Sequence, residues 1–203
     1  MLEFLKYHGS GNDFILIDNR NGRIDPSDQS LIRSLCDRKF GIGADGLILL
    51  TDHPELDFEM QYFNRDGPEG SMCGNGARCI AVFAQRLGLV EKRARFQAFD
   101  GAHDAIIEKK GVRISMMDIT GIDKRVDHFF LNTGSPHVVL FREDVKTMNV
   151  FEEGRKIRYN KLYGKEGTNV DFIWRSGDGI YVRTYERGVE DETLSCGTGV
   201  VAS

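Results

Sequence analysis

Several features that would direct a functional assignment are absent from this sequence of 203 residues. No apolar run approaches the roughly 20 residues that a membrane-spanning helix needs, and the N-terminus, MLEFLKYHGSGNDF, lacks the apolar core of a signal peptide. Lysine and arginine are scattered and the formal net charge is −4, whereas phosphate binding needs a concentrated basic face. We therefore expect a cytoplasmic protein with no membrane partner and no nucleic-acid partner.

Cysteine is also scarce, with four residues at positions 36, 73, 79 and 196. An intracellular chain of this size is expected to keep its cysteines reduced. Zinc sites usually contain close C-x₂₋₄-C pairs, whereas the nearest pair here, Cys73 and Cys79, is spaced C-x₅-C. The sequence therefore predicts no metal site.

One glycine-rich segment has the spacing of a dinucleotide-binding loop but not its surroundings. Residues 41–46 read GIGADG, which satisfies G-x-G-x-x-G. The dinucleotide fingerprint follows a strand and opens a helix, whereas here a helical pattern precedes the segment and the strand pattern GLILL follows it. We therefore expect no nicotinamide or flavin cofactor.

An internal repeat organises the sequence that is present. The tetrapeptide CGNG at 73–76 recurs as CGTG at 196–199, displaced by 123 residues. Three further pairs keep the same order at nearly the same displacement: Gly9 with Gly134, Asp45 with Asp171, and Asn64-Arg65 with Glu186-Arg187. Shared order makes these short matches significant together, so the chain is predicted to contain two copies of one unit.

The first copy shows what the unit contains. Apolar patterning predicts helices over 26–39 and 77–87, and strands over 14–18, 46–51, 58–64, 94–99, 103–109 and 112–117. The second helix is apolar nearly all round, which is typical of a helix enclosed by sheet. The predicted fold class is α/β (α+β), with pseudo-symmetric units at 1–122 and 123–203 facing across a cleft. Only seven residues follow Cys196, so we expect the second unit to be incomplete and the natural protein to be longer.

The repeated cysteines suggest acid–base chemistry. Cys73 and Cys196 each precede Gly-x-Gly, and at a helix start the free N–H groups and the dipole stabilise a thiolate, which predicts lowered thiol pKa values. Those N–H groups also suit a carboxylate. Two such elements would place one sulfur on each side of an α-carbon, an arrangement for stereoinversion. Cys36 and Cys79 are instead expected to be small apolar core residues.

These motifs resemble those of the diaminopimelate epimerases, cofactor-independent isomerases of lysine and cell-wall precursor synthesis. The resemblance extends through nearly all of the chain, at Gly11-Asn12-Asp13-Phe14, Gly41-Ile42-Gly43-Ala44-Asp45, Phe63-Asn64, Cys73-Gly74-Asn75-Gly76-Ala77-Arg78, Gly134 with Pro136-His137, Asn169-Val170, Glu186-Arg187-Gly188 and Cys196-Gly197-Thr198-Gly199.

By that resemblance the substrate is L,L-diaminopimelate, no cofactor is needed, and Cys73 and Cys196 are the catalytic acid and base. His137 and Glu186 are expected to adjust the pKa values of the cysteines. The residues expected to bind the substrate are Asn12, Asn64, Gly74, Asn75, Asn169, Glu186, Arg187, Gly197 and Thr198. A homodimer is compatible with the resemblance. Two positions depart from it: Ser135 stands where many members have Asn, and Gly46 where some have Gln.

Two other functions remain open at this point. Proline and hydroxyproline racemases are similar in fold and in their paired cysteines, but a histidine is typical where Asn75 stands. A non-catalytic amino-acid-binding relative would have inert sulfurs. Cysteine reactivity separates a catalytic protein from a non-catalytic relative. A catalytic thiolate is alkylated quickly near pH 7, and its substrate protects it from alkylation.

Overall fold

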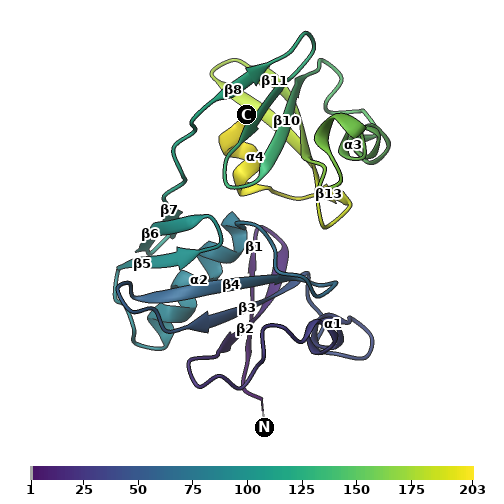
Figure 1. Ribbon diagram of the computed structural model, residues 1–203. Coiled ribbons are helices and arrows are strands. Elements are labelled where there is room, and N and C mark those ends of the chain that lie inside the picture. The colour runs from purple at the N-terminus through teal and green to yellow at the C-terminus, as the bar shows by residue number, and fades with distance from the viewer. Residues whose placement is uncertain (1) are drawn as a thin grey trace. The chain divides into compact units, whose positions relative to one another are not determined.

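The computed structural model describes residues 2–203 and divides the chain into two compact units, residues 1–115 and 116–203 (Figure 1). The sequence predicted this boundary after residue 122. No helix in the described part of the chain is both long and apolar enough to span a membrane.

Unit 1 is a seven-stranded sheet whose strands follow the order of the chain. The β2–β3 and β4–β5 pairs are parallel and the other neighbours are antiparallel. Two predicted strands, 46–51 and 58–64, have the predicted bounds. The strands are β1 (Leu5–Gly9), β2 (Asn12–Asp18), β3 (Gly46–Thr51), β4 (Phe58–Asn64), β5 (Arg93–Ala98), β6 (Gly101–Glu108) and β7 (Gly111–Ile114).

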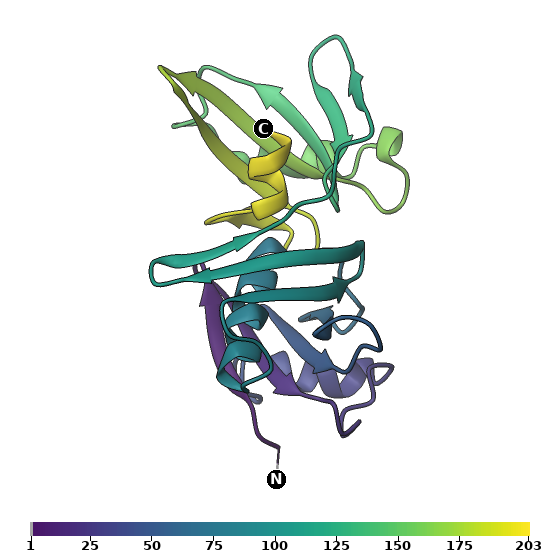
Figure 2. The same cartoon turned by 90° about the vertical axis from the view of Figure 1, so that its left-hand side faces the viewer.

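The sheet curls around α2 (Gly74–Arg86) and carries α1 (Gln29–Cys36) on its other face (Figures 1 and 2). Successive side chains of β2 point to opposite faces of the sheet: Phe14 packs in the cluster with α2, and Ile15 packs in the cluster with α1. Helix α1 is shorter than the predicted 26–39, because Asp28 caps its first turn by accepting from the Leu31 N–H at 2.9 Å and Asp37 is extended.

Unit 2 repeats the arrangement around its central strands. Its six-stranded sheet has the order β13-β12-β11-β10-β9-β8, and only the β10–β11 pair is parallel among the described strands of this unit. The elements are β8 (Ile122–Lys124), β9 (Phe129–Asn132), β10 (Pro136–Phe141), α3 (Val150–Arg158), the 3₁₀ turn η1 (Lys161–Tyr163), β11 (Asn169–Ser176), β12 (Gly179–Glu186), β13 (Asp191–Thr193) and α4 (Gly197–Ala202).

The strand register confirms the internal repeat. In the parallel pair β2–β3, Phe14 lies opposite Gly46, and in β10–β11, His137 lies opposite Asn169. Each residue and its counterpart are 123 positions apart, the displacement between the two CGxG motifs. In both units a helix, α1 or α3, makes the parallel connection.

The same register corrects one proposed match. At a displacement of 123 the counterpart of Asp45 is Thr168, and Asp171 lies three positions further along, inside β11. The two aspartates are therefore not equivalent positions, although both are close to a cysteine motif through the contacts described below.

Candidate active site

Cys73 lies at the start of the helix enclosed by the first sheet. It is the N-cap of α2, with φ −117° and ψ 105°, and its Sγ accepts a hydrogen bond from the Gly76 N–H at 3.4 Å. The residue is 9% exposed. The sequence predicted this position for the sulfur, beside a backbone donor at a helix N-terminus.

Two of the predicted substrate-binding residues gather around this sulfur. The Oδ1 atom of Asn12, at the first residue of β2, is 3.8 Å from Cys73 Sγ. The same oxygen accepts a hydrogen bond from Asn75 Nδ2 at 3.4 Å. The turn before β2 and the first turn of α2 therefore form one polar site.

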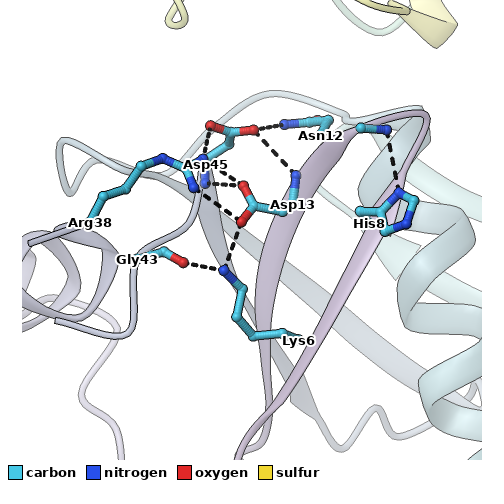
Figure 3. Close-up of polar contacts among 8 residues, drawn as sticks. Lys6, His8, Asn12, Asp13, Arg38, Gly43 and Asp45 are labelled. Atoms are coloured by element: carbon cyan, nitrogen blue, oxygen red, sulfur yellow. Dashed lines mark hydrogen bonds and ion pairs between the residues drawn. The ribbon is translucent and has the colours of Figure 1, made fainter.

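A cluster of charged residues lies behind Asn12 (Figure 3). Asp45 Oδ2 accepts from Asn12 Nδ2 at 3.0 Å and from the Asp13 N–H at 3.2 Å. Arg38 donates to Asp45 at 2.7 Å and to Asp13 at 2.6 Å, and Lys6 donates to Asp13 at 2.7 Å. Burial alone would raise the pKa of Asp13, but hydrogen bonds from Arg38 and Lys6 outweigh it and hold that pKa well below its usual range.

Asn64 lies at the end of β4, where Tyr62 holds its side chain. The Tyr62 hydroxyl donates to Asn64 Oδ1 at 2.9 Å. A Cβ at Gly46, on the neighbouring strand, would lie 2.6 Å from the Tyr62 ring. The tyrosine therefore explains the departure at Gly46, because its ring fills the space that a longer side chain would need.

Cys196 has the same place in unit 2 but different surroundings. It is the N-cap of α4, with φ −113° and ψ 113°, and its Sγ is 3.3 Å from Thr198 Oγ1. Burial above all, and then the negative charges of Glu186 and Asp171, raise the pKa of the Cys196 thiol far above its usual range. The hydrogen bond with Thr198 opposes this shift without overcoming it.

The predicted lowering of the thiol pKa is therefore wrong for Cys196. Cys196 is only 7% exposed, so a thiolate there would lose the hydration that it needs, and two nearby carboxylates disfavour a second negative charge. The resting group at this position is a thiol.

A hydrogen-bonded chain connects Cys196 to a buried histidine on β10. His137 is fully buried, with Nδ1 2.7 Å from Asp171 Oδ2 and Nε2 2.9 Å from Thr198 Oγ1. Thr184 completes the set by donating to Asp171 Oδ1 at 2.6 Å. The Thr198 hydroxyl thus lies between the imidazole of His137 and the sulfur of Cys196.

The second glycine of each CGxG motif is a site of close packing. A Cβ at Gly76 would lie 2.9 Å from Ile48 Cδ1, and a Cβ at Gly199 would lie 2.4 Å from Asp171 Oδ1. Both helix starts therefore sit against the sheet with no room for a side chain.

Asn169 holds the turns on either side of it. Its Nδ2 donates to Ser135 Oγ at 2.8 Å and to the Pro136 carbonyl at 2.9 Å, and its Oδ1 accepts from the Arg187 N–H at 2.8 Å. Ser135, which departs from the family pattern, is therefore a partner of Asn169. The amide fixes the backbone that carries Arg187.

Arg187 follows the end of β12 in a charged neighbourhood. Its Nη1 is 3.8 Å from Glu166 Oε2, at the edge of ion-pair distance. Burial, and then the positive charge of Arg158, lower the pKa of Arg187. Arg158 itself pairs with Glu190 at 2.9 Å, which organises the turn after β12. The two arginines thus lie among the carboxylates of Glu166 and Glu190.

Sequence reasoning missed several residues of these two sites. Asp171 and Asp45 carried a signal, because both had been singled out as repeat positions, but no role was assigned to them. The sequence assigned no function to the remaining residues of the two sites, which are Lys6, Asp13, Arg38, Tyr62, Arg158, Thr184 and Glu190.

Comparisons with known proteins agree with this architecture. The family model for diaminopimelate epimerase matches residues 4–120 and 129–203. Diaminopimelate epimerase of Flavobacterium psychrophilum is 47% identical over 204 residues, covering all of this chain and 80% of that protein. Diaminopimelate epimerase of Aquifex aeolicus is 41% identical, covering 99% of this chain and 79% of that protein.

Solved structures of more distant proteins share the fold. A hydroxyproline epimerase from Agrobacterium vitis has a TM-score of 0.71 at 13% identity, and a probable proline racemase from Agrobacterium radiobacter has 0.69 at 16% identity. Each comparison covers 98% of this chain and 74% of the other. At these identities the likeness concerns the fold of two pseudo-symmetric α/β units. The sequence matches are closer, and by them the chain belongs to the diaminopimelate epimerase family of isomerases.

Proposed function

We propose that this chain converts L,L-diaminopimelate to the meso form by inverting one α-carbon, with Cys73 and Cys196 as the acid–base pair and no cofactor. This activity would serve lysine and peptidoglycan precursor synthesis. The observation that carries the proposal is the equivalence of the two cysteines: each caps a helix at the same point of a repeated unit, with nearly the same φ and ψ. Membership of the family supports the choice of substrate.

Stereoinversion explains why two groups are needed. One thiolate removes the α-proton and becomes a thiol, and the other thiol delivers its proton to the opposite face and becomes a thiolate. A single base would tend to return the proton to the face from which it came. No net proton is consumed, but the two sulfurs exchange protonation states and must exchange them back through solvent before the next turnover in the same direction.

The environment of Cys196 supports assigning it as the acid at the start of a turnover. Because burial and the charges of Glu186 and Asp171 keep its pKa high, the resting group holds a proton. Cys73 is then the base, positioned where the Gly76 N–H donates to its sulfur and stabilises negative charge.

The His137–Asp171 pair offers a way to accommodate the thiolate that Cys196 becomes. With a thiol, S–H donates to the Thr198 oxygen, O–H donates to His137 Nε2, and Nδ1–H donates to Asp171. Once Cys196 has given its proton to the substrate, the Thr198 hydroxyl can turn and donate to the thiolate. His137 Nε2 can then accept from Asn169 Nδ2, 3.5 Å away, while Asp171 continues to hold the ring through Nδ1.

The remaining predicted residues would hold the substrate. The backbone around Gly74, Asn75, Gly197 and Thr198 would hold the α-carboxylate at the reacting centre. Arg187 would bind the distal carboxylate, because its guanidinium is half-buried and its 3.8 Å contact with Glu166 is too long to be a close ion pair. Asn64 would contribute its amide group, and Glu186 would pair with an ammonium group of the substrate.

Deuterium incorporation tests the proposal directly. The protein is incubated with L,L-diaminopimelate in D₂O, and mass spectrometry and chiral chromatography follow the label and the meso product. We expect one deuterium at the inverted α-carbon of each meso molecule. Meso product without solvent label at the α-carbon, or no turnover of diaminopimelate alongside rapid turnover of proline, would contradict the proposal.

A further inference from the structure

Two charged residues of unit 1 hold the ends of a line of two amides beside Cys73. Asp45 accepts from the Nδ2 atom of Asn12 at 3.0 Å. Asn12 Oδ1 in turn accepts from Asn75 Nδ2 at 3.4 Å, and Asn75 Oδ1 accepts from the Arg78 guanidinium. Figure 3 shows the acidic end of this line, where Asp45 meets Asn12.

The charges at the two ends fix the direction of both amides. An ionised carboxylate can only accept, so the Asn12 atom that faces Asp45 must be its nitrogen. A guanidinium can only donate, so the Asn75 atom that faces Arg78 must be its oxygen. The two requirements agree: Asn12 then offers an oxygen to Asn75, and Asn75 offers a nitrogen. Turning either amide would bring two donors or two acceptors together.

The direction matters because the sulfur lies beside the oxygen of Asn12. Asn12 Oδ1 is 3.8 Å from Cys73 Sγ, and a carbonyl oxygen can accept from a thiol but can give nothing to a thiolate. This contact favours the protonated sulfur, whereas the Gly76 N–H at 3.4 Å favours the thiolate. Both contacts affect how strongly Cys73 takes up a proton.

We infer that Asp45 and Arg78 are positioning residues that hold the Asn12 and Asn75 amides in one direction, so that Asn12 presents an acceptor to the thiol of Cys73. The inference rests on the proposed function, in which Cys73 takes the α-proton. Because Asn12 Oδ1 is in place to accept from the new S–H group, Cys73 is a stronger base than it would be with the helix N-terminus alone.

The surrounding charges keep Asp45 in its role. Arg38 donates to Asp45 Oδ1 at 2.7 Å, which leaves Oδ2 for Asn12 and for the Asp13 N–H. The hydrogen bonds that Arg38 donates to Asp13 and Asp45 raise its pKa, so the guanidinium stays charged. His8 and Lys6 on β1 are the other titratable groups drawn in this cluster, and they contact Gly11, Gly43 and Asp13 rather than Asn12 (Figure 3).

The test is the titration of Cys73 in an Asp45→Asn variant. The substitution keeps the size of the side chain but leaves a single acceptor oxygen for Arg38, the Asp13 N–H and Asn12, which weakens the hold on Asn12 and lets its nitrogen turn toward the sulfur. We expect the pKa of Cys73 to fall by about one unit. Cysteine labelled with ¹³C at Cβ reports the titration by NMR, and its signal is assigned by its loss in Cys73→Ser. Asp45→Ala serves as a second variant with the same expected direction.

Two further variants separate positioning from a general effect of charge. In an Asn12→Ala background, Asp45→Asn should cause no further shift if Asp45 acts through Asn12. Asp18→Asn removes a carboxylate at the far end of β2, where Asp18 pairs with Arg20 at 2.7 Å, and should leave the Cys73 titration unchanged. No shift in Asp45→Asn, an equal shift in the Asn12→Ala background, or an equal shift in Asp18→Asn would overturn the inference.

The titration needs no turnover, so its failure is distinguishable from failure of the proposed function. Unchanged Cys73 titration in an enzyme that still inverts diaminopimelate removes the positioning role alone. Full epimerisation by Cys73→Ser removes the proposed function, whatever the titration shows.

Discussion

The caps of α2 and α4 have the same backbone conformation and different chemical surroundings. Their φ and ψ angles differ by less than ten degrees, as the shared CGxG sequence leads one to expect. Cys73 lies beside a backbone N–H and the amide of Asn12, whereas Cys196 lies beside the Thr198 hydroxyl and near the carboxylates of Glu186 and the buried Asp171.

Part of the difference lies in the motif, where Thr198 takes the place of Asn75, and the rest comes from the sheets. Asn12 is at the start of β2, while His137 and Asp171 belong to the interior of β10 and β11. A repeated tetrapeptide therefore sets where each sulfur lies, and residues far from it in sequence help to set how readily that sulfur loses its proton.

The strongest test of the comparison replaces each sulfur in turn. Cys73→Ser and Cys196→Ser should each reduce kcat by about a thousandfold or more, because a hydroxyl is too weak an acid to replace a thiol. Cys36→Ala is the matched control: burial raises the pKa of that thiol to about 11, and the change should affect stability rather than turnover. Near-normal epimerisation by either serine variant would contradict the two-base mechanism.

Arg187 tests whether unit 2 recognises the distal end of the substrate. Arg187→Ala should lower kcat/KM for diaminopimelate by about a hundredfold, because a buried carboxylate would lose its partner. Lysine, which lacks that carboxylate, should be a poor substrate of both forms and nearly insensitive to the change. Arg175→Ala, at an exposed position of β11, is the control. Equal losses for lysine and diaminopimelate would place Arg187 outside substrate recognition.

Thr198→Val breaks the link between His137 and Cys196 while keeping the size of the side chain. The Thr198 hydrogen bond lowers the pKa of Cys196, so its loss should raise that pKa further. We expect roughly a tenfold fall in kcat, the equivalent of one hydrogen bond, together with slower alkylation of Cys196 at a fixed alkaline pH. Thr198→Ser should restore both values. A Thr198→Val enzyme in which Cys196 is alkylated at the wild-type rate would mean that the hydroxyl is only a packing group.

The smallest expected effect concerns stability and His103, a buried histidine of unit 1 that can be compared with His137 in unit 2. His103 Nε2 is 2.8 Å from Asp100 Oδ1 and Nδ1 is 2.8 Å from the Ser115 carbonyl, so only the protonated ring satisfies both acceptors. Burial lowers the pKa of His103, but the bonds to Asp100 and Ser115 outweigh it and raise the pKa above 6.5.

The stabilisation from His103 is therefore complete below pH 6.5 and is lost as the pH rises through its folded pKa. His103→Gln should cost on the order of 1 kcal/mol at pH 6 and remove this part of the pH dependence. Urea unfolding between pH 5.5 and 9 measures it. A wild-type free energy of unfolding that increases over this range, with the variant parallel to it, would contradict the assignment.

Local pattern was sufficient for much of the fold. The strands β3 and β4 were predicted at their observed bounds, because each is a run of β-formers ended by a break in the pattern. The apolar helix after Cys73 and the duplication were also predicted. The helix begins at Gly74 and not at 77 because Cys73 itself caps it.

The electrostatics of the sites could not be predicted in the same way. The raised pKa of Cys196 depends on burial and on Asp171, which is 25 positions away in the chain and reaches the site through the register of β11. The bonds of Arg38 to Asp13 and Asp45 likewise join separate elements. Periodicity reports which face of an element is apolar, but it does not report which polar side chains meet across a sheet.

The close packing at Gly76 and Gly199 has a consequence for second-site rescue. A methyl group at residue 76 would meet the end of a flexible aliphatic side chain, Ile48, so Gly76→Ala should be recoverable by Ile48→Val. A methyl group at residue 199 would meet Asp171 Oδ1, and a buried carboxylate that already holds His137 and Thr184 cannot be shortened without losing those bonds. In a library of compensating changes, lesions at 76 should yield suppressors and lesions at 199 should yield only revertants.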